Sequence, residues 1–289
     1  MKKIILSLLI SFIAISSQAQ DLKAFAIFNK DGKEVTYNEM IKEISKADVV
    51  FFGEHHNCPI AHWLEFEVAK SLVKKHKSKL AIGFEMLEAD NQMIVDEYMS
   101  GLVSYDRYLK EVRHWYNYES DYDPVVQLAR DNKLKVIATN VPRRYAAMVN
   151  KNGLESLEKL SEEAKRFIAP LPIAFDNSSS ENEMFSMMNM MSGGKAGDAD
   201  KIAMAQSVKD ATMAWFISEN FEGKFLHLNG CFHSDFNGGI IPYLNQYKPN
   251  LKYSTICTVR QDEINKLGEE SEGRADFVIC IPTDMNIAM

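Results

Sequence analysis

Seven short apolar runs, rich in β-branched and aromatic residues, recur along this chain of 289 residues. Most of the runs do not alternate polar with apolar positions, which is typical of strands buried on both faces of a sheet. Helical patterns separate several runs, and one of them is an apolar stripe at a spacing of four from Ile60 to Leu72. Strands that alternate with helices predict an α/β fold with a mostly parallel central sheet flanked by helices, and with helical insertions. The runs span residues 24–28, 49–52, 80–84, 134–138, 224–228, 253–259 and 277–281.

The first nineteen residues have the features of a secretory signal peptide. Lys2 and Lys3 precede an apolar run, and small residues stand at the two positions that determine cleavage after Ala19. A membrane-spanning helix needs about 20 apolar residues, so an uncleaved anchor is the less favoured alternative. We therefore expect a signal peptide over residues 1–19 and a single α/β domain over residues 20–289. No cysteine follows the small residues, so we expect an exported, soluble, periplasmic protein without a lipid anchor or a transmembrane segment in the mature chain.

The composition excludes two classes of protein. Lys and Arg total 33 and Asp and Glu total 40, and the resulting net charge of −7 argues against a basic nucleic-acid-binding protein. Hydrophobic residues make up 46% of the chain, which is too much apolar surface for a mainly disordered protein.

The four cysteines, Cys58, Cys231, Cys257 and Cys280, form no CxxC pair, which argues against a zinc finger or a thioredoxin-like site. Cys257 and Cys280 lie in strand-like runs and are expected to be buried thiols. Export permits disulfides, so the pairing of all four cysteines stays open.

Two similar motifs follow apolar runs at distant points of the chain. Gly53, Glu54 and His56 follow one run, and Gly230 and His233 follow another, with the same spacing from glycine to histidine. In a parallel sheet both histidines would emerge at the edge where open α/β sheets bind ligands. A carboxylate and an imidazole two residues apart can bind a metal or exchange protons. The alternatives are that Glu54 caps the next helix while one of its neighbouring histidines packs on the sheet, and that His233 is a loop histidine without a role.

Glu85 ends a third apolar run. A buried carboxylate without a partner is costly, so Glu85 should contact a metal, a cation or a shared proton; the simplest alternative is a salt bridge to Arg or Lys. Together with Glu54, His56 and His233 it forms a cluster that suits a divalent metal, namely Mn, Zn or Co, or acid–base catalysis without a metal. These four residues are the candidate catalytic residues and the candidate metal ligands.

Five further residues are candidates for ligand binding. Asn140 and Arg143 follow another strand-like run, and Arg143 can bind a carboxylate or phosphate through two parallel hydrogen bonds. Gln206, Asp210 and Met213 are spaced by four and three, so they share one face of a helix. The alternatives are a turn with solvated charges for the first pair and a solvent-exposed helix face for the other three.

Other polarizable or aromatic residues give weaker indications. Five methionines between residues 184 and 191 could form an adaptable apolar surface over an aromatic ligand, although a gap-filling segment is the simpler interpretation. Tyr116, Tyr118 and Tyr122 could ligate ferric iron, although aromatic clusters more often serve packing. His62 is six residues after His56 and is expected to lie outside the site.

Taken together, the motifs resemble those of the ChaN-like haem-binding uptake family, a branch of a superfamily that also contains the Tiki proteases and the erythromycin-esterase-like enzymes. The resemblance covers about residues 49–244 and rests on the two Gly-x-x-His motifs, Asn-x-Pro-Arg and Gln-x-x-x-Asp-x-x-Met. It implies an α/β fold, export, a role in haem or iron acquisition, and haem bound at a dimer interface. In the enzymatic branches, the positions that match Glu54, His56, Glu85 and His233 serve as metal ligands or acid–base groups.

Two functions are consistent with these features. The first is an exported protein that binds haem, or another small molecule, for haem or iron acquisition, with Arg143 pairing with a propionate and with a homodimer left open. The second is a metal-dependent hydrolase, protease-like or esterase-like, that activates water at the Glu/His cluster. The sequence leaves open whether the chain is an enzyme and which group ligates haem iron.

Overall fold

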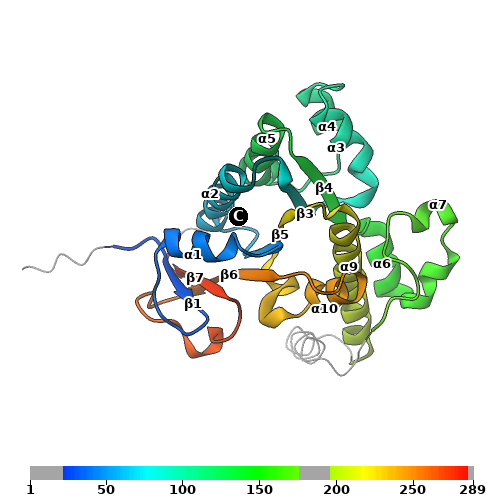
Figure 1. Ribbon diagram of the computed structural model, residues 1–289. Helices are drawn as coiled ribbons and strands as arrows, with labels where there is room; N and C mark the ends of the chain where they lie inside the picture. Colours follow the sequence, from blue (N-terminus) through cyan, green and yellow to red (C-terminus); the bar gives the residue numbers. More distant parts are fainter. Residues whose placement is uncertain (1–21, 176–195, 286–289) are drawn as a thin grey trace, which may run out of the picture.

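The computed structural model describes residues 22–175 and 196–285, and a seven-stranded sheet runs through its centre (Figure 1). The strand order is β1-β7-β6-β2-β5-β3-β4. All seven apolar runs of the sequence form strands. The expected signal peptide, residues 1–19, and the methionine-rich segment, residues 184–191, lie outside the described residues. The strands are β1 (Ala26–Asn29), β2 (Val49–Glu54), β3 (Leu80–Glu88), β4 (Lys135–Asn140), β5 (Lys224–Gly230), β6 (Tyr253–Gln261) and β7 (Phe277–Pro282).

The sheet is mostly parallel, as predicted. Neighbouring strands pair in parallel except β1, which pairs antiparallel with β7 at one edge. β2 lies between β6 and β5, and its register pairs Gly53 with Cys257 on one side and with Asn229 on the other. Parallel neighbours need crossover connections, which the helices supply.

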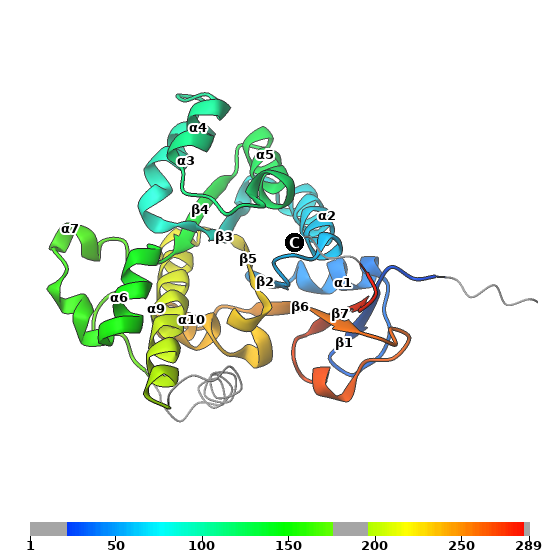
Figure 2. The ribbon, with the colours of Figure 1, turned by 180° about the vertical axis from the view of Figure 1, so that it is seen from behind.

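Helices cover both faces of the sheet (Figure 2). The first face is covered by α1 (Tyr37–Ile44), α2 (Pro59–His76), α3 (Gln92–Met99) and α5 (Asp123–Asp131), and α4 (Tyr105–Glu111) packs on α3. The second face is covered by α9 (Ala196–Asn220) and α10 (Ile240–Tyr247), and α6 (Arg143–Asn152) packs against α9. The short helix α7 (Glu162–Lys165) lies beyond α6.

The side chains of β2 show why its apolar run does not alternate with polar residues. Val50 and Phe52 pack in the core under α1 and α2, whereas Val49 and Phe51 pack on the other face with Met213 of α9. All of these side chains are buried. A strand covered on both faces needs apolar side chains at every position.

Four neighbouring strands place polar groups at one edge of the sheet. β2, β5, β3 and β4 are consecutive and parallel, so their carboxyl ends lie together. Glu54, Gly230 and Asn140 end three of these strands, and Glu85 lies near the end of β3, which continues to Glu88. Within the described ranges, no helix is both long and apolar enough to cross a membrane.

Candidate functional site

A cavity of about 760 Å³ opens at this edge of the sheet. Small-molecule sites have volumes of about 300–1,000 Å³, so the cavity has the size of a ligand site. His56, Glu85 and His233 line it, and Glu54 contacts His56 from below. Segments that are far apart in the sequence therefore deliver the four predicted residues to one place.

Glu54 fixes the ring of His56. Glu54 Oε1 accepts hydrogen bonds from His56 Nδ1 at 2.7 Å and from the Tyr122 hydroxyl at 2.8 Å. Glu54 is buried, whereas the His56 side chain is 43% exposed. Burial would lower the pKa of His56, but the hydrogen bond to Glu54 and the charge of Glu85 raise it. The Glu54 carboxylate therefore orients His56 through a hydrogen bond and does not cap the N-terminus of α2.

His233 lies between two carboxyl groups. Its Nδ1 is 2.5 Å from Asp210 Oδ1, and its Nε2 is 3.2 Å from Glu85 Oε1. Burial would lower the pKa of His233, but the charges of Glu85 and Asp210 raise it to about 10. Burial would raise the pKa of Glu85, but the charge of His233 holds it well below its usual range. His233 is therefore an imidazolium at neutral pH in the metal-free site, and a metal would have to displace one of its ring protons.

Gly230 allows the Glu54–His56 pair and the Glu85–His233 pair to lie close together. Its N–H donates to Glu85 Oε2 at 2.7 Å. A Cβ at this position would lie 2.9 Å from His56 Nε2 and 3.5 Å from Glu85 Oε2, so a side chain here would displace the His56 ring. His56 Nε2 and Glu85 thus face the same point of the cavity.

Asn140, Arg143 and Gln206, three of the predicted ligand-binding residues, line the cavity. Asn140 Nδ2 donates to Glu85 O at 2.9 Å, and Arg143 Nε donates to Glu88 Oε1 at 2.7 Å while 65% of the Arg143 side chain is exposed. Asn140 Oδ1 and Gln206 Oε1 are buried acceptors without a hydrogen-bond donor in the described part of the chain. Buried acceptors without a donor are costly, so a ligand that donates hydrogen bonds would be favoured here.

The other two predicted ligand-binding residues lie deeper. Asp210 is buried and holds His233. Met213 is fully buried in the apolar core with Val49 and Phe51. The face that carries Asp210 and Met213 is thus neither solvated nor a simple cavity wall, because the sheet, α6 and α10 enclose α9.

A buried network behind the cavity was missed by the sequence analysis. His62 Nδ1 lies 2.9 Å from Glu54 Oε2 and 3.0 Å from Glu65 Oε2, and its Nε2 lies 3.3 Å from Asp121 Oδ2. His62 does not line the cavity, in keeping with its expected place outside the residues that touch a ligand, but it contacts Glu54 from behind the cavity. The spacing of three between His62 and Glu65 on one helix face was the available indication.

The pKa values of Glu54 and Glu65, two of the carboxyl groups in this network, shift in opposite directions. Burial raises the pKa of Glu65 well above its usual value, and the charge of Glu54 adds to the effect. Burial would also raise the pKa of Glu54, but hydrogen bonds to His56 and His62 lower it. Burial would lower the pKa of His62, but hydrogen bonds to Glu54 and Glu65 raise it to about 11. Glu54 is thus the carboxyl group that favours the ionised form, Glu65 is the one that favours the protonated form, and His62 is charged at neutral pH.

The sequence matches one protein family over most of its length. The family described as haem-binding uptake, Tiki superfamily, ChaN, matches residues 40–244, which is more than half of the chain. This chain belongs to that family. The resemblance drawn from the strand-end motifs is therefore confirmed, and the cavity lies among the matched residues of a ChaN-family fold.

Solved structures share the ChaN-family fold. ChaN of Campylobacter jejuni, which binds haem cofacially, has a TM-score of 0.69 and 18% sequence identity, covering 89% of this chain and 96% of that chain. A protein of Bacillus cereus has a TM-score of 0.51 and 12% identity, covering 88% of this chain and 93% of that chain. At these identities the likeness establishes the fold alone.

A curated relative is much longer than this chain. Protein RETICULATA-RELATED 5, chloroplastic, of Arabidopsis thaliana is 25% identical over 155 residues, which are 52% of this chain and 21% of that protein. The matching part therefore spans about a fifth of the relative's length.

Proposed function

We propose that this ChaN-family member is an exported haem-binding protein that serves haem or iron acquisition. The observation that carries the proposal is the cavity at the carboxyl edge of the sheet, whose walls combine aromatic and basic side chains. Trp115, Tyr116 and Phe232 supply flat apolar surfaces, and Arg143 and Lys209 supply positive charge. These aromatic surfaces and positive charges are complementary to a flat porphyrin ring with two propionates.

Tyr116 is the residue best placed to bind haem iron. Tyr118 and Tyr122 are fully buried, and their hydroxyls are hydrogen-bonded to Tyr108 at 2.6 Å and to Glu54 at 2.8 Å. Tyr116 is 75% exposed and lines the cavity. A phenolate oxygen is an established protein ligand for haem iron.

His114 is the alternative iron ligand on the same wall. Its Nδ1 lies 2.9 Å from Trp115 O, which can only accept a proton, so Nδ1 carries the hydrogen. Nε2 then carries the lone pair that a metal needs. His114 also lines the cavity.

A hemin titration tests the proposal. The purified protein is expected to give a saturable Soret shift at micromolar concentration. Tyr116→Phe is expected to weaken binding about 10-fold or more, equivalent to about 1.4 kcal/mol, and to remove the phenolate-to-iron charge-transfer band. Tyr253→Phe, at the opposite end of the sheet, is the matched control and should preserve both. Loss of haem binding in His114→Ala, but not in Tyr116→Phe, would identify His114 as the residue that coordinates the iron. A wild-type protein whose addition causes no Soret shift would contradict haem binding.

The proposal includes export and assembly. Residues 1–19 would direct export, and residues 20–289 would form the exported domain. ChaN of Campylobacter jejuni binds haem cofacially. An equivalent arrangement here would hold two haems between two copies of this chain, with Tyr116 at the shared face.

A hydrolase is the second candidate, and the Glu54–His56 pair favours it. Glu54 holds His56 Nδ1, which leaves Nε2 toward the cavity as a general base. The ionised Glu85 faces the same point and would stabilise the imidazolium that forms when His56 takes a proton. In a metal-dependent form, a divalent ion such as Mn, Zn or Co would activate water. Its ligands would come from His56, Glu85 and His233 in the cavity, once His233 has lost a proton. Glu54, His62 and Glu65 also bring their ligand atoms within 4.8 Å of one another, but they are buried behind the cavity.

Hydrolysis of p-nitrophenyl esters and of a mixed peptide library tests this candidate. His56→Asn is expected to lower kcat about 100-fold or more, because it removes the general base, with little change in KM. His76→Asn, at the end of α2, is the matched control and should hydrolyse at the wild-type rate. A rate that falls on chelation and returns with Mn²⁺, Zn²⁺ or Co²⁺ would assign the metal-dependent form. Absence of wild-type hydrolysis, or an unchanged rate in His56→Asn, would contradict this role.

A further inference from the structure

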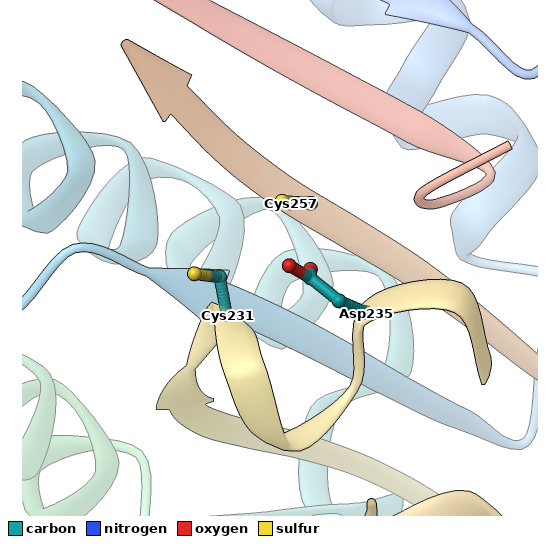
Figure 3. A group of neighbouring side chains, drawn as sticks. All are labelled: Cys231, Asp235 and Cys257. Atoms are coloured by element: carbon teal, nitrogen blue, oxygen red, sulfur yellow. The ribbon is translucent and has the colours of Figure 1, made fainter. Parts of the chain in front are cut away.

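Two cysteines and an aspartate converge at a second place near the end of β5. Cys231 and Asp235 belong to the two short turns that follow β5, and Cys257 lies on β6 (Figure 3). One potential ligand atom from each residue lies within 4.8 Å of the other two. All four cysteines of the chain are free thiols, and Cys257 is buried.

This cluster is separate from the Glu54 network. Successive residues of a strand face opposite sides of the sheet, so Gly53 and Glu54 of β2 lie on opposite faces. The cysteine cluster packs on the face of Gly53, and the Glu54 network lies on the other face. A Cβ on Gly53 would lie 2.8 Å from Cys231 Cα and 3.0 Å from Ile256 O. The absence of a side chain at Gly53 lets the turn with Cys231 pack directly on β2, beside Cys257.

The buried carboxylate of Asp235 has only weak donors beside it among the described residues. Its Oδ1 accepts no well-directed hydrogen bond, although the thiols of Cys231 and Cys257 lie within hydrogen-bonding reach of the carboxylate. Its Oδ2 lies 3.3 Å from Arg274 Nη1. Thiols are weak donors, so a cation between the two sulfurs and Asp235 would satisfy the buried carboxylate oxygen better than the thiols do.

We propose that Cys231, Asp235 and Cys257 bind a thiophilic divalent cation of the zinc class. On binding, each thiol releases its proton to solvent, and two sulfur–metal bonds and one carboxylate–metal bond form. A water molecule or another ligand completes the tetrahedron. Two thiolates and one carboxylate carry one more negative charge than the cation neutralises, and the guanidinium of Arg274 beside Asp235 balances it.

The donor types favour zinc over calcium or magnesium. Thiolate ligands select soft or borderline metals, whereas calcium and magnesium require oxygen ligands. With zinc–sulfur bonds of about 2.3 Å, tetrahedral geometry separates the two sulfurs by roughly 3.7 Å, so the cluster needs only a small contraction. Because Cys231 precedes His233 by two residues, the metal would also fix the turn that carries His233 into the cavity.

Cobalt titration of the fully reduced, metal-free protein tests the site. We expect one equivalent of Co²⁺ to produce a near-ultraviolet thiolate-to-cobalt charge-transfer band that Zn²⁺ abolishes. The Glu54 network contains no thiol and cannot produce this band. Even the hydrogen-bond partners of metal ligands are worth about 10–100-fold in affinity, so Cys231→Ser and Cys257→Ser should each weaken binding about 100-fold or more.

Further variants separate metal binding from misfolding. Asp235→Cys, which offers a third thiolate, should intensify the band, and Cys280→Ser, on β7, should leave it unchanged. Circular dichroism confirms the fold of each variant. The proposal is overturned if the reduced wild type gives no band or if the Cys231→Ser/Cys257→Ser double variant retains it. A mass lower by about 2 Da before reduction, mapped to Cys231 and Cys257, would overturn it in favour of a disulfide.

Discussion

His233→Ala is expected to destabilise the folded protein by about 3–5 kcal/mol at neutral pH. The variant removes the imidazolium that contacts the buried carboxyl groups of Glu85 and Asp210. Each carboxyl group then loses its principal partner while it remains buried. Urea unfolding followed by circular dichroism measures the loss.

The difference in stability between wild type and His233→Ala depends on pH. The pKa of His233 is raised from 6.5 to about 10, so its stabilisation is complete below pH 6.5 and disappears as pH rises through 10. The pKa of Glu85 is lowered from 4.5, so its stabilisation is present above pH 4.5 and disappears on strong acidification. The difference should therefore be greatest between pH 4.5 and 6.5 and decline on both sides.

His227→Ala is the matched control for this pH dependence. His227 is equally buried on β5, where its ring contacts Thr139 and Asn229, and burial lowers its pKa to about 4. A neutral side chain cannot lose charge between pH 7 and 10, so the cost of His227→Ala should stay constant there. A cost of His233→Ala that is also constant between pH 7 and 10 would show that His233 is neutral in the folded protein.

The strands were predictable because burial on both faces leaves a strong local pattern in the sequence. The meeting of His56 and His233 was also predictable, since both follow strands of one parallel sheet whose carboxyl ends share an edge. The contacts of His62 were not, because they depend on the path of the turn before α2. Met213 was assigned to ligand binding from its helix spacing, but it lies on the side of α9 that packs against Val49 and Phe51 of the sheet.

Glu54→Gln and Glu65→Gln are expected to differ sharply, although both residues are buried Glu side chains that contact His62. Glu54 is the ionised member and also holds His56, so Glu54→Gln should cost about 2–4 kcal/mol. Burial and the charge of Glu54 raise the pKa of Glu65, which favours its protonated form. A glutamine closely resembles a protonated glutamic acid, so Glu65→Gln should cost less than about 1 kcal/mol.

An NMR titration of the imidazole rings distinguishes the two carboxyl groups independently of stability. The pKa of His62, about 11 in the wild type, should fall substantially in Glu54→Gln, which removes its counter-charge, and much less in Glu65→Gln. The pKa of His56 should fall only in Glu54→Gln, since Glu65 does not contact that ring. If Glu65→Gln instead lowers the pKa of His62 and the stability as much as Glu54→Gln does, the negative charge resides on Glu65. The Glu54 carboxyl would then be neutral and could not orient His56 as a base toward the cavity.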